Sequence, residues 1–126
     1  MGEYNSLVKV DSNTVALAYS GNGGNGYIKT FTIPSSGASI TEVFEYKHDS
    51  IYGKHNSFVQ VDDDTYALAY SGTGNDGFIK TFTIPADGSA ITQVKKLEHD
   101  TDNGTFNSLI KVSSGSDTYI LSLIHI

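Results

Sequence analysis

Residues 5–34 read NSLVKVDSNTVALAYSGNGGNGYIKTFTIP, and residues 56–85 read NSFVQVDDDTYALAYSGTGNDGFIKTFTIP. Residues 107–112 (NSLIKV) are the start of a third copy. The copies are 51 residues apart, and 28 of the 49 positions in residues 5–53 are identical in the second copy without a gap. A period of this length is typical of stacked repeat architectures, in which neighbouring units cover the apolar faces that one unit cannot bury alone. The repeat therefore predicts architecture more directly than it predicts a ligand.

Composition and charge narrow the class of protein. A hydrophobic content of 38% with 17% charged residues is typical of a globular chain and not of a disordered or membrane one. A formal net charge of −6 disfavours nucleic acid and anionic membrane surfaces as partners, because both require a basic footprint. The chain has no cysteine, which excludes disulfides, thiolate metal sites and cysteine nucleophiles.

Each complete copy predicts four short strands separated by turn residues, which indicates an all-β protein. The second strand (TVALAYS in the first copy) is apolar on both sides, so both of its faces must be covered. The fourth strand carries Glu42, Glu45 and Lys47, as an outer edge in water should. The expected strands are residues 6–10, 14–20, 26–33, 40–48, 57–61, 65–71, 77–84, 91–99 and 108–112.

A four-stranded sheet covered on both faces by copies of itself describes a propeller blade. The pattern NS-(L/F)-V-x-V-D-x-x-T-x-ALAYSG-x-G-x-x-G-(Y/F)-IKTFTI, closing on His-Asp, resembles the blade repeats of about 50 residues in bacterial and environmental β-propeller proteins. The resemblance covers almost the whole chain. It implies a β-propeller-like fold with two complete four-stranded antiparallel blades, at residues 1–53 and 54–104, and the first strands of a third blade at residues 105–126.

The third copy departs from the template towards its end. Its first turn is two residues longer, and residues 117–126 read DTYILSLIHI where ALAYSG is expected. Residues 121–126 resemble a translated sequencing adapter, which predicts a non-native tail on a truncated metagenomic fragment; the alternative is a divergent strand. Closed propellers have about 4–8 blades. We therefore expect the partners to be other copies of the chain or the missing blades of a longer one.

Paired histidine and aspartate residues recur at the end of the fourth strand. They are consistent with a general acid–base pair or metal ligands, or with a hydrogen-bonded corner that ties the strand to its loop. Recurrence in every copy favours the structural interpretation, because a single active site needs no copies. The recurring positions to which we assign a structural role are His48, Asp49, His99, Asp100, Asn5, Asn56 and Asn107.

The Gly-rich and Asp-rich segments predict turns and not ligand sites. Residues 21–26 and 72–77 lack the nine-residue period of calcium-binding repeats, and a strand follows them where a phosphate loop requires a helix. Residues 11–13 and 62–64 lack the glycine of a calcium loop, and the third copy has serines there. We expect no metal and no cofactor.

Candidate ligand contacts lie where the copies differ most. In an up-and-down blade, the loop between strands two and three and the connection to the next blade lie at the same end, and loops on a rigid scaffold often carry function. Aromatic and polar groups there suit sugars or peptides, although surface drift between the copies is the alternative. The candidate residues are Tyr52, Lys54, His55, Asn103, Phe106, Asn25 and Asp76.

These observations predict a role in binding. We expect a non-catalytic interaction scaffold, from a secreted or cell-surface protein, that binds carbohydrate or protein through the loops between strands two and three and between blades. The alternative is a fragment of a propeller-type glycan hydrolase or lyase whose active site lies outside this segment. An enzyme would concentrate unique charged residues near the axis of a few blades, and the two copies differ little there.

Overall fold

The computed structural model describes residues 2–112 and 117–124. Within them the chain is all-β, with two single-turn 3₁₀ segments, η1 and η2, no α-helix, and no helix long and apolar enough to cross a membrane. The elements are β1 (Glu3–Asp11), β2 (Thr14–Ser20), η1 (Asn22–Gly24), β3 (Gly26–Thr32), β4 (Thr41–Asp49), β5 (Lys54–Asp62), β6 (Thr65–Ser71), η2 (Thr73–Asn75), β7 (Gly77–Thr83), β8 (Thr92–Asp100), β9 (Thr105–Lys111) and β10 (Tyr119–Ile124).

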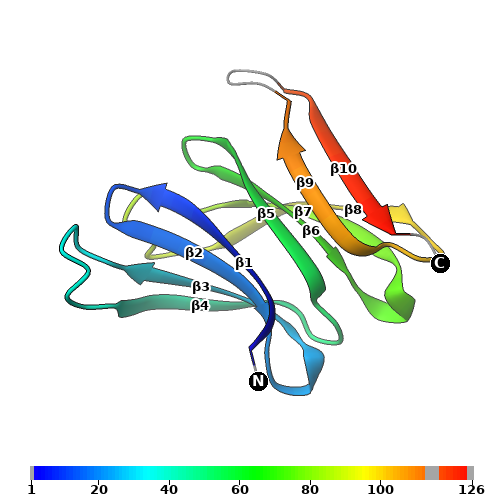
Figure 1. Cartoon of the computed structure of the whole chain (residues 1–126), viewed down its shortest axis with the longest axis horizontal. Coiled ribbons are helices and arrows are strands. Elements are labelled where there is room, and N and C mark those ends of the chain that lie inside the picture. Colours follow the sequence, from blue (N-terminus) through cyan, green and yellow to red (C-terminus); the bar gives the residue numbers. More distant parts are fainter. Residues whose placement is uncertain (1, 113–116, 125–126) are drawn as a thin grey trace.

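The strands form two four-stranded meanders, β1-β2-β3-β4 and β5-β6-β7-β8, followed by the hairpin β9-β10 (Figure 1). All pairings are antiparallel, and equivalent positions of the two copies pair in the same register: Leu7 lies opposite Leu17, and Phe58 opposite Leu68. The predicted all-β class and its four-stranded antiparallel sheets are confirmed. The expected order of four strands per copy is therefore also the order in each sheet.

The first strand of each copy starts earlier than the sequence predicts. β1 begins at Glu3, and its pairing with β2 is irregular between Glu3 and Ser6. β5 has the same irregularity between Lys54 and Ser57. A bulge interrupts the two-residue alternation of side chains, so the pattern of apolar residues detects only the part of the strand after it.

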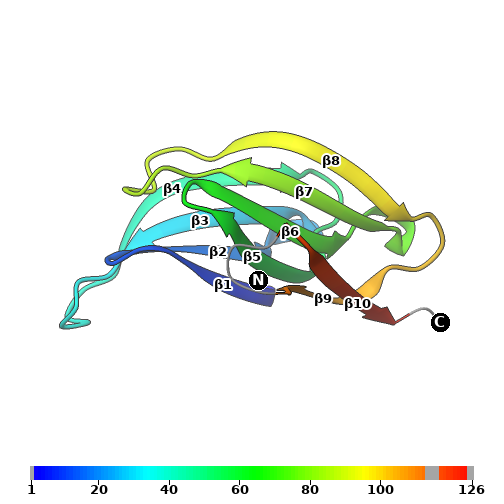
Figure 2. The ribbon, with the colours of Figure 1, turned by 90° about the horizontal axis from the view of Figure 1, so that it is seen from above.

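The two four-stranded sheets pack face to face, with β1, β5 and β9 side by side (Figures 1 and 2). Small residues of the first sheet, Ala16 and Ala18, lie in the same buried cluster as large residues of the second, Tyr66, Leu68 and Tyr70. Pairing small with large side chains across the interface lets the layers interdigitate at the density of a protein core. This interface is the main hydrophobic core.

The opposite face of the second sheet is also covered. Ala67 and Ala69 of β6 share a second cluster with Leu109 of β9, and Tyr119 and Leu121 of β10 pack against it. Both faces of β6 are therefore buried, as predicted for the second strand of a copy. Ala69 has no exposed surface.

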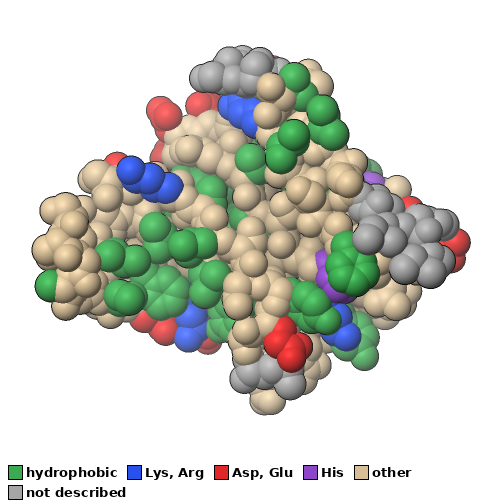
Figure 3. All heavy atoms as spheres, viewed as in Figure 1, with side chains coloured by type: hydrophobic (Ala, Val, Ile, Leu, Met, Phe, Trp, Pro, Cys, Tyr) green, Lys and Arg blue, Asp and Glu red, His purple; other side chains and the backbone are tan. Residues whose placement is uncertain are grey.

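The equivalent strand of the first copy differs from this prediction. Val15, Leu17 and Tyr19 of β2 are only half-buried, because no other sheet of the described chain packs on their side. Hydrophobic side chains gather over the sheet β1–β4 in the face shown by Figure 3. We call the side of this sheet that carries Val15, Leu17 and Tyr19 the open face.

The third copy forms the hairpin of β9 and β10. Its strands pair from Tyr119 opposite Lys111 to Ile124 opposite Thr105. Of the expected longer turn, residues 113–116 lie outside the described residues. Of the expected tail, residues 121–124 belong to β10, and residues 125–126 lie outside the described residues.

Candidate functional site

One ring from each copy contributes to a row at the start of β1, β5 and β9. The ring centroids of Tyr4 and His55 are 4.4 Å apart, and those of His55 and Phe106 are 4.2 Å apart. The three residues occupy the same position of the 51-residue repeat. Tyr4 is 40% exposed and Phe106 54% exposed, so the row presents ring surface to solvent. We call Tyr4, His55 and Phe106 the aromatic row.

All three residues of the aromatic row have a left-handed backbone. Their φ angles are 55° for Tyr4, 51° for His55 and 54° for Phe106. This conformation costs an L-residue with a Cβ about 1–2 kcal/mol relative to the right-handed region, and it is rare for bulky side chains. Strained positions of this kind are concentrated at functional sites. The same unfavourable conformation recurs in three copies although the ring differs in each.

The asparagine that follows each row residue holds the preceding copy in place. The Asn56 side-chain amide donates to the carbonyl oxygen of Tyr4 at 3.0 Å and to that of Gly53 at 2.9 Å. Asn107 repeats this with the carbonyl of His55, at 3.4 Å, and with that of Gly104, at 2.9 Å. In the first copy the amide of Asn5 donates to Gly2 at 3.1 Å. Asn56 and Asn107 thus fix the backbone of the row from the next copy.

Serine hydroxyls add a second link between successive first strands. The Ser6 hydroxyl accepts a hydrogen bond from the backbone N–H of Phe58 at 3.0 Å. The Ser57 hydroxyl accepts one from Leu109 at 2.9 Å. Because the same two links join the first copy to the second and the second to the third, the spacing of the rings is a product of the repeat.

The structure brings the two variable loops together at the end that carries the row. The backbone N–H of Gly53 donates to the carbonyl of Gly24 at 3.0 Å, and Gly104 donates to Asn75 at 2.8 Å. The Lys54 ammonium lies 4.5 Å from the ring centroid of Tyr52, which is 38% exposed. Tyr52 and Lys54 are therefore beside the row, and His55 and Phe106 are in it.

The other three predicted candidates lie in turns. The carbonyl oxygens of Asn25 and Asp76 accept the backbone N–H groups of Gly21 and Gly72, each at 2.9 Å, and close the turns around η1 and η2. The backbone N–H of Asn103 donates to the Asp100 carboxylate at 3.0 Å. These contacts give all three residues a part in shaping the loops.

Sequence reasoning missed Tyr4. Its signal was its position, 51 residues before His55, in a segment that precedes the first expected strand. The pairing of β1 with β2 is irregular between Glu3 and Ser6, so this segment lacks the alternation of side chains by which a strand is predicted.

The recurring aspartates close the corner after the fourth strand. The Asp49 carboxylate accepts the backbone N–H groups of Ile51 at 2.9 Å and Tyr52 at 3.2 Å, and the hydroxyl of Tyr70 at 3.0 Å. Asp100 accepts the N–H groups of Asp102 and Asn103 in the same way. Burial, with the neighbouring Asp49 charge, raises the pKa of Tyr70, so this hydroxyl stays protonated as a donor.

Of the recurring histidines, His48 is buried and His99 is half-buried. His48 is 4% exposed, its ring lies edge-on to that of Tyr70 at 4.8 Å, and neither ring nitrogen has a hydrogen-bond partner in the described chain. Burial, followed by the charge of Lys80, lowers the pKa of His48 to about 3. Burial also lowers the pKa of His99. The His48 imidazole is therefore uncharged near neutral pH.

The described residues hold no group of three or more His, Cys, Asp or Glu side chains that could bind a metal ion. The chain has no match among protein-family models, curated proteins or solved structures. The aromatic row and the loops beside it are the features of the described chain that bear on its function.

Proposed function

We propose that this chain is a run of β-propeller blades that serves as a non-catalytic interaction scaffold and binds a carbohydrate along the aromatic row. The observation that carries the proposal is the repeated, partly exposed and strained position of Tyr4, His55 and Phe106. Aromatic faces bury apolar area and carry a negative quadrupole, so they pack against the polarised C–H groups of a sugar ring. A row of three rings suits a short oligosaccharide.

The polar groups around the row support a sugar over a purely apolar ligand. Burial and the charge of Lys54 lower the pKa of His55, so its imidazole is neutral at neutral pH and offers both a donor and an acceptor. Lys54 and the Tyr52 hydroxyl supply further hydrogen-bonding groups at the same end. Pockets for small molecules combine aromatic walls with a few such polar groups.

The stacking of the copies supports the propeller part of the proposal. Successive first strands lie side by side, successive sheets pack small residues on large ones, and the fourth strands β4 and β8 are largely exposed. Propeller blades have this radial order, with the first strand innermost. The open face of the first sheet fits the same order, since it corresponds to the face that is buried in the second sheet.

The test is a titration with a panel of neutral oligosaccharides, in which calorimetry or NMR chemical shifts measure binding. Phe106→Ala and Tyr4→Ala are expected to weaken binding at least tenfold, because each removes one ring of the row. The matched control is Phe44→Ala, a ring of similar exposure on β4. Binding that survives both row variants, or that Phe44→Ala weakens equally, would contradict the proposal.

Stability separates the functional role of the row from a structural one. Phe106→Gly removes the ring and also relieves the left-handed backbone, worth about 1–2 kcal/mol. We expect this variant to lose binding while it unfolds at a urea concentration no lower than that of Phe106→Ala. A ring needed only for folding would instead make Phe106→Gly less stable than Phe106→Ala, without a separate loss of binding by the folded protein.

A further inference from the structure

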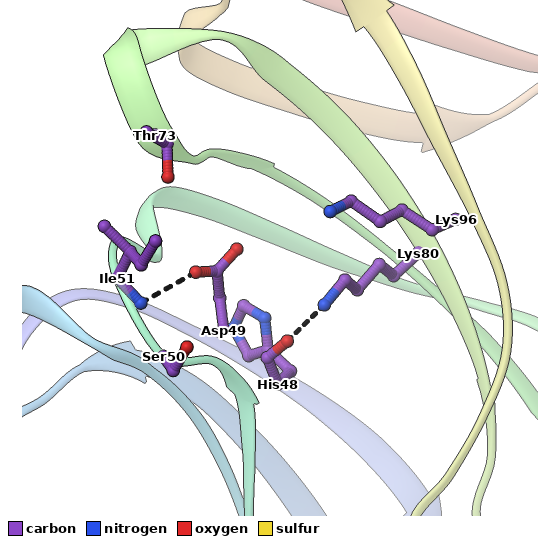
Figure 4. Close-up of a pocket in the computed structure, with 7 residues that line it drawn as sticks. All are labelled: His48, Asp49, Ser50, Ile51, Thr73, Lys80 and Lys96. Carbon is purple, nitrogen blue, oxygen red and sulfur yellow. Dashed lines mark hydrogen bonds between the residues drawn. The ribbon is translucent and has the colours of Figure 1, made fainter.

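A cavity of about 260 Å³ lies between the two copies, and none of its lining residues belongs to the aromatic row (Figure 4). One wall is the corner of residues 48–51, at the end of β4. The other wall belongs to the second sheet and consists of Thr73 of η2, Lys80 of β7 and Lys96 of β8. The cavity thus exists only because two copies are stacked.

Lys80 is a buried cation at this cavity. It is 5% exposed, and its ammonium donates a hydrogen bond to the carbonyl oxygen of His48. An ammonium has three N–H donors, so further donors remain for a ligand. Burial lowers the pKa of Lys80; the Asp49 charge opposes that shift, and the Lys96 charge adds a smaller contribution to it. Lys80 and Lys96 both line this cavity.

In the first copy, glutamate side chains neutralise the charge of the equivalent lysine. Lys29, the equivalent of Lys80, forms ion pairs with Glu42 at 2.8 Å and Glu45 at 3.4 Å. In the second copy Gln93 replaces the first glutamate and Lys96 replaces the second. One carboxylate is lost and the other is exchanged for a cation, so the ion pairs of the first copy have no counterpart here. The acids whose charges act on the two lysines are Asp49 and Glu98, which replaces Lys47 of the first copy.

The two lysines that line the cavity face one lining acid, Asp49. The Asp49 carboxylate already accepts three hydrogen bonds, from Ile51, Tyr52 and Tyr70. Within the part of the chain that the structure describes, neither Lys80 nor Lys96 forms an ion pair with a carboxylate. Two ammonium groups that line one cavity with one engaged carboxylate favour a bound anion. Lys96 is exposed, and the burial of Lys80 strengthens that attraction relative to bulk water.

We propose that this cavity binds a tetrahedral oxyanion, a sulfate or phosphate group, between Lys80 and Lys96, with the Thr73 hydroxyl as a further donor. Lysine binds such groups as a point charge, and the second lysine balances the second charge of the anion. The group can be a free ion or an ester on a larger molecule. This site is separate from the aromatic row and does not depend on the carbohydrate proposal.

The experiment exploits the difference between the copies. Sodium sulfate and sodium phosphate are titrated against sodium chloride at equal ionic strength, with backbone amide NMR shifts of residues 48–51 and 73 as the readout. Lys96→Glu restores the charge found in the first copy and is expected to weaken oxyanion binding at least tenfold. Lys95→Glu is the matched control, because it makes the same charge change one residue away on the opposite face of β8 and should change affinity less than twofold.

Two further arms make the result decisive. Lys80→Met removes the buried charge, keeps the length of the side chain and should abolish the shifts. A sulfated and a phosphorylated monosaccharide, each compared with its inorganic anion and with the unmodified sugar, separate an ester ligand from a free ion. Equal shifts in chloride and in sulfate or phosphate, or equal losses in Lys95→Glu and Lys96→Glu, would overturn the proposal. Binding of neutral oligosaccharides should be unchanged in Lys96→Glu, so the two proposals can fail independently.

Discussion

The imidazole ring of His48 occupies the space that a side chain at Gly26 would need. A Cβ built on Gly26 would lie 2.5 Å from both Cε1 and Nε2 of that ring, a separation that real Cβ atoms essentially never show. The second copy repeats the relationship, with 2.3 Å between a Cβ on Gly77 and Cε1 of His99. The recurring glycine therefore makes room for the recurring histidine ring, and in the first copy also for the backbone of Gly53, whose Cα would lie 3.0 Å from the same Cβ.

Gly26→Ala should destabilise the fold by about 1–3 kcal/mol, because the new methyl group overpacks this buried contact. Urea unfolding measures the change. Gly2→Ala is the control, since a Cβ there has no neighbour within 4 Å. In a His48→Ala background the ring is gone and the same substitution should cost less; an equal cost in both backgrounds would show that His48 is not the obstacle.

The free energy of unfolding should decrease as the pH is lowered, because His48 is buried in its neutral form. Its pKa is about 3 in the folded chain, compared with 6.5 for an ordinary histidine, so the unfolded chain takes up the proton first. The stability it contributes is fully present above pH 6.5 and is lost as the pH falls towards 3. The slope between these values approaches about 1.4 kcal/mol per pH unit.

Urea unfolding of the wild type and of His48→Gln, from about pH 7 to about pH 4.5, tests this linkage. The variant lacks the titrating group, so its free energy of unfolding should depend less on pH. Parallel curves for the two proteins would mean that the histidine is hydrated in the folded chain.

Leu17 and Leu68 are the same residue of the repeat in different surroundings. Leu68 has no exposed surface, and Leu17 is half-buried on the open face. Leu68→Ala should cost about 2–5 kcal/mol, as for other fully buried leucines. Leu17→Ala should cost less than half as much, measured on dilute protein. Equal costs would show that the open face is covered in solution.

The open face should make the 126-residue chain self-associate, since it corresponds to the face that packs on a neighbouring copy in the second sheet. Sedimentation velocity over a range of concentrations measures this. Leu17→Glu should shift the distribution towards monomer, whereas Lys95→Glu, an exposed change on β8 of the second sheet, serves as a charge control. A wild-type chain that stays monomeric at all concentrations would contradict this expectation.

The strands were largely predictable from sequence, for a physical reason. β2 and β6 coincide with the expected residues 14–20 and 65–71, because alternating β-branched and apolar residues between turn residues leave a short strand as the local solution. The early starts of β1 and β5 were not predictable, because a bulge has no fixed pattern of side chains.

The candidate site was predictable only in part. His55 and Phe106 were found as variable aromatic residues at the loop end of the repeat. Their union with Tyr4 was not foreseen, because it depends on three left-handed backbones and on asparagine hydrogen bonds from the next copy. No local pattern in the sequence encodes a contact between residues 51 positions apart until the copies are stacked.

The amino-acid sequence by itself determined the all-β class, the four strands of each copy and their order, since these follow from short-range alternation and turn residues. Only the tertiary structure decided which copy of a residue is buried, which rings meet and which lysine faces a cavity. Lys29 and Lys80 are identical in the repeat, yet one pairs with two glutamates and the other is enclosed beside a second lysine. The difference arises because burial and charge depend on the neighbouring sheet and on the residues it presents, and these are not properties of one strand.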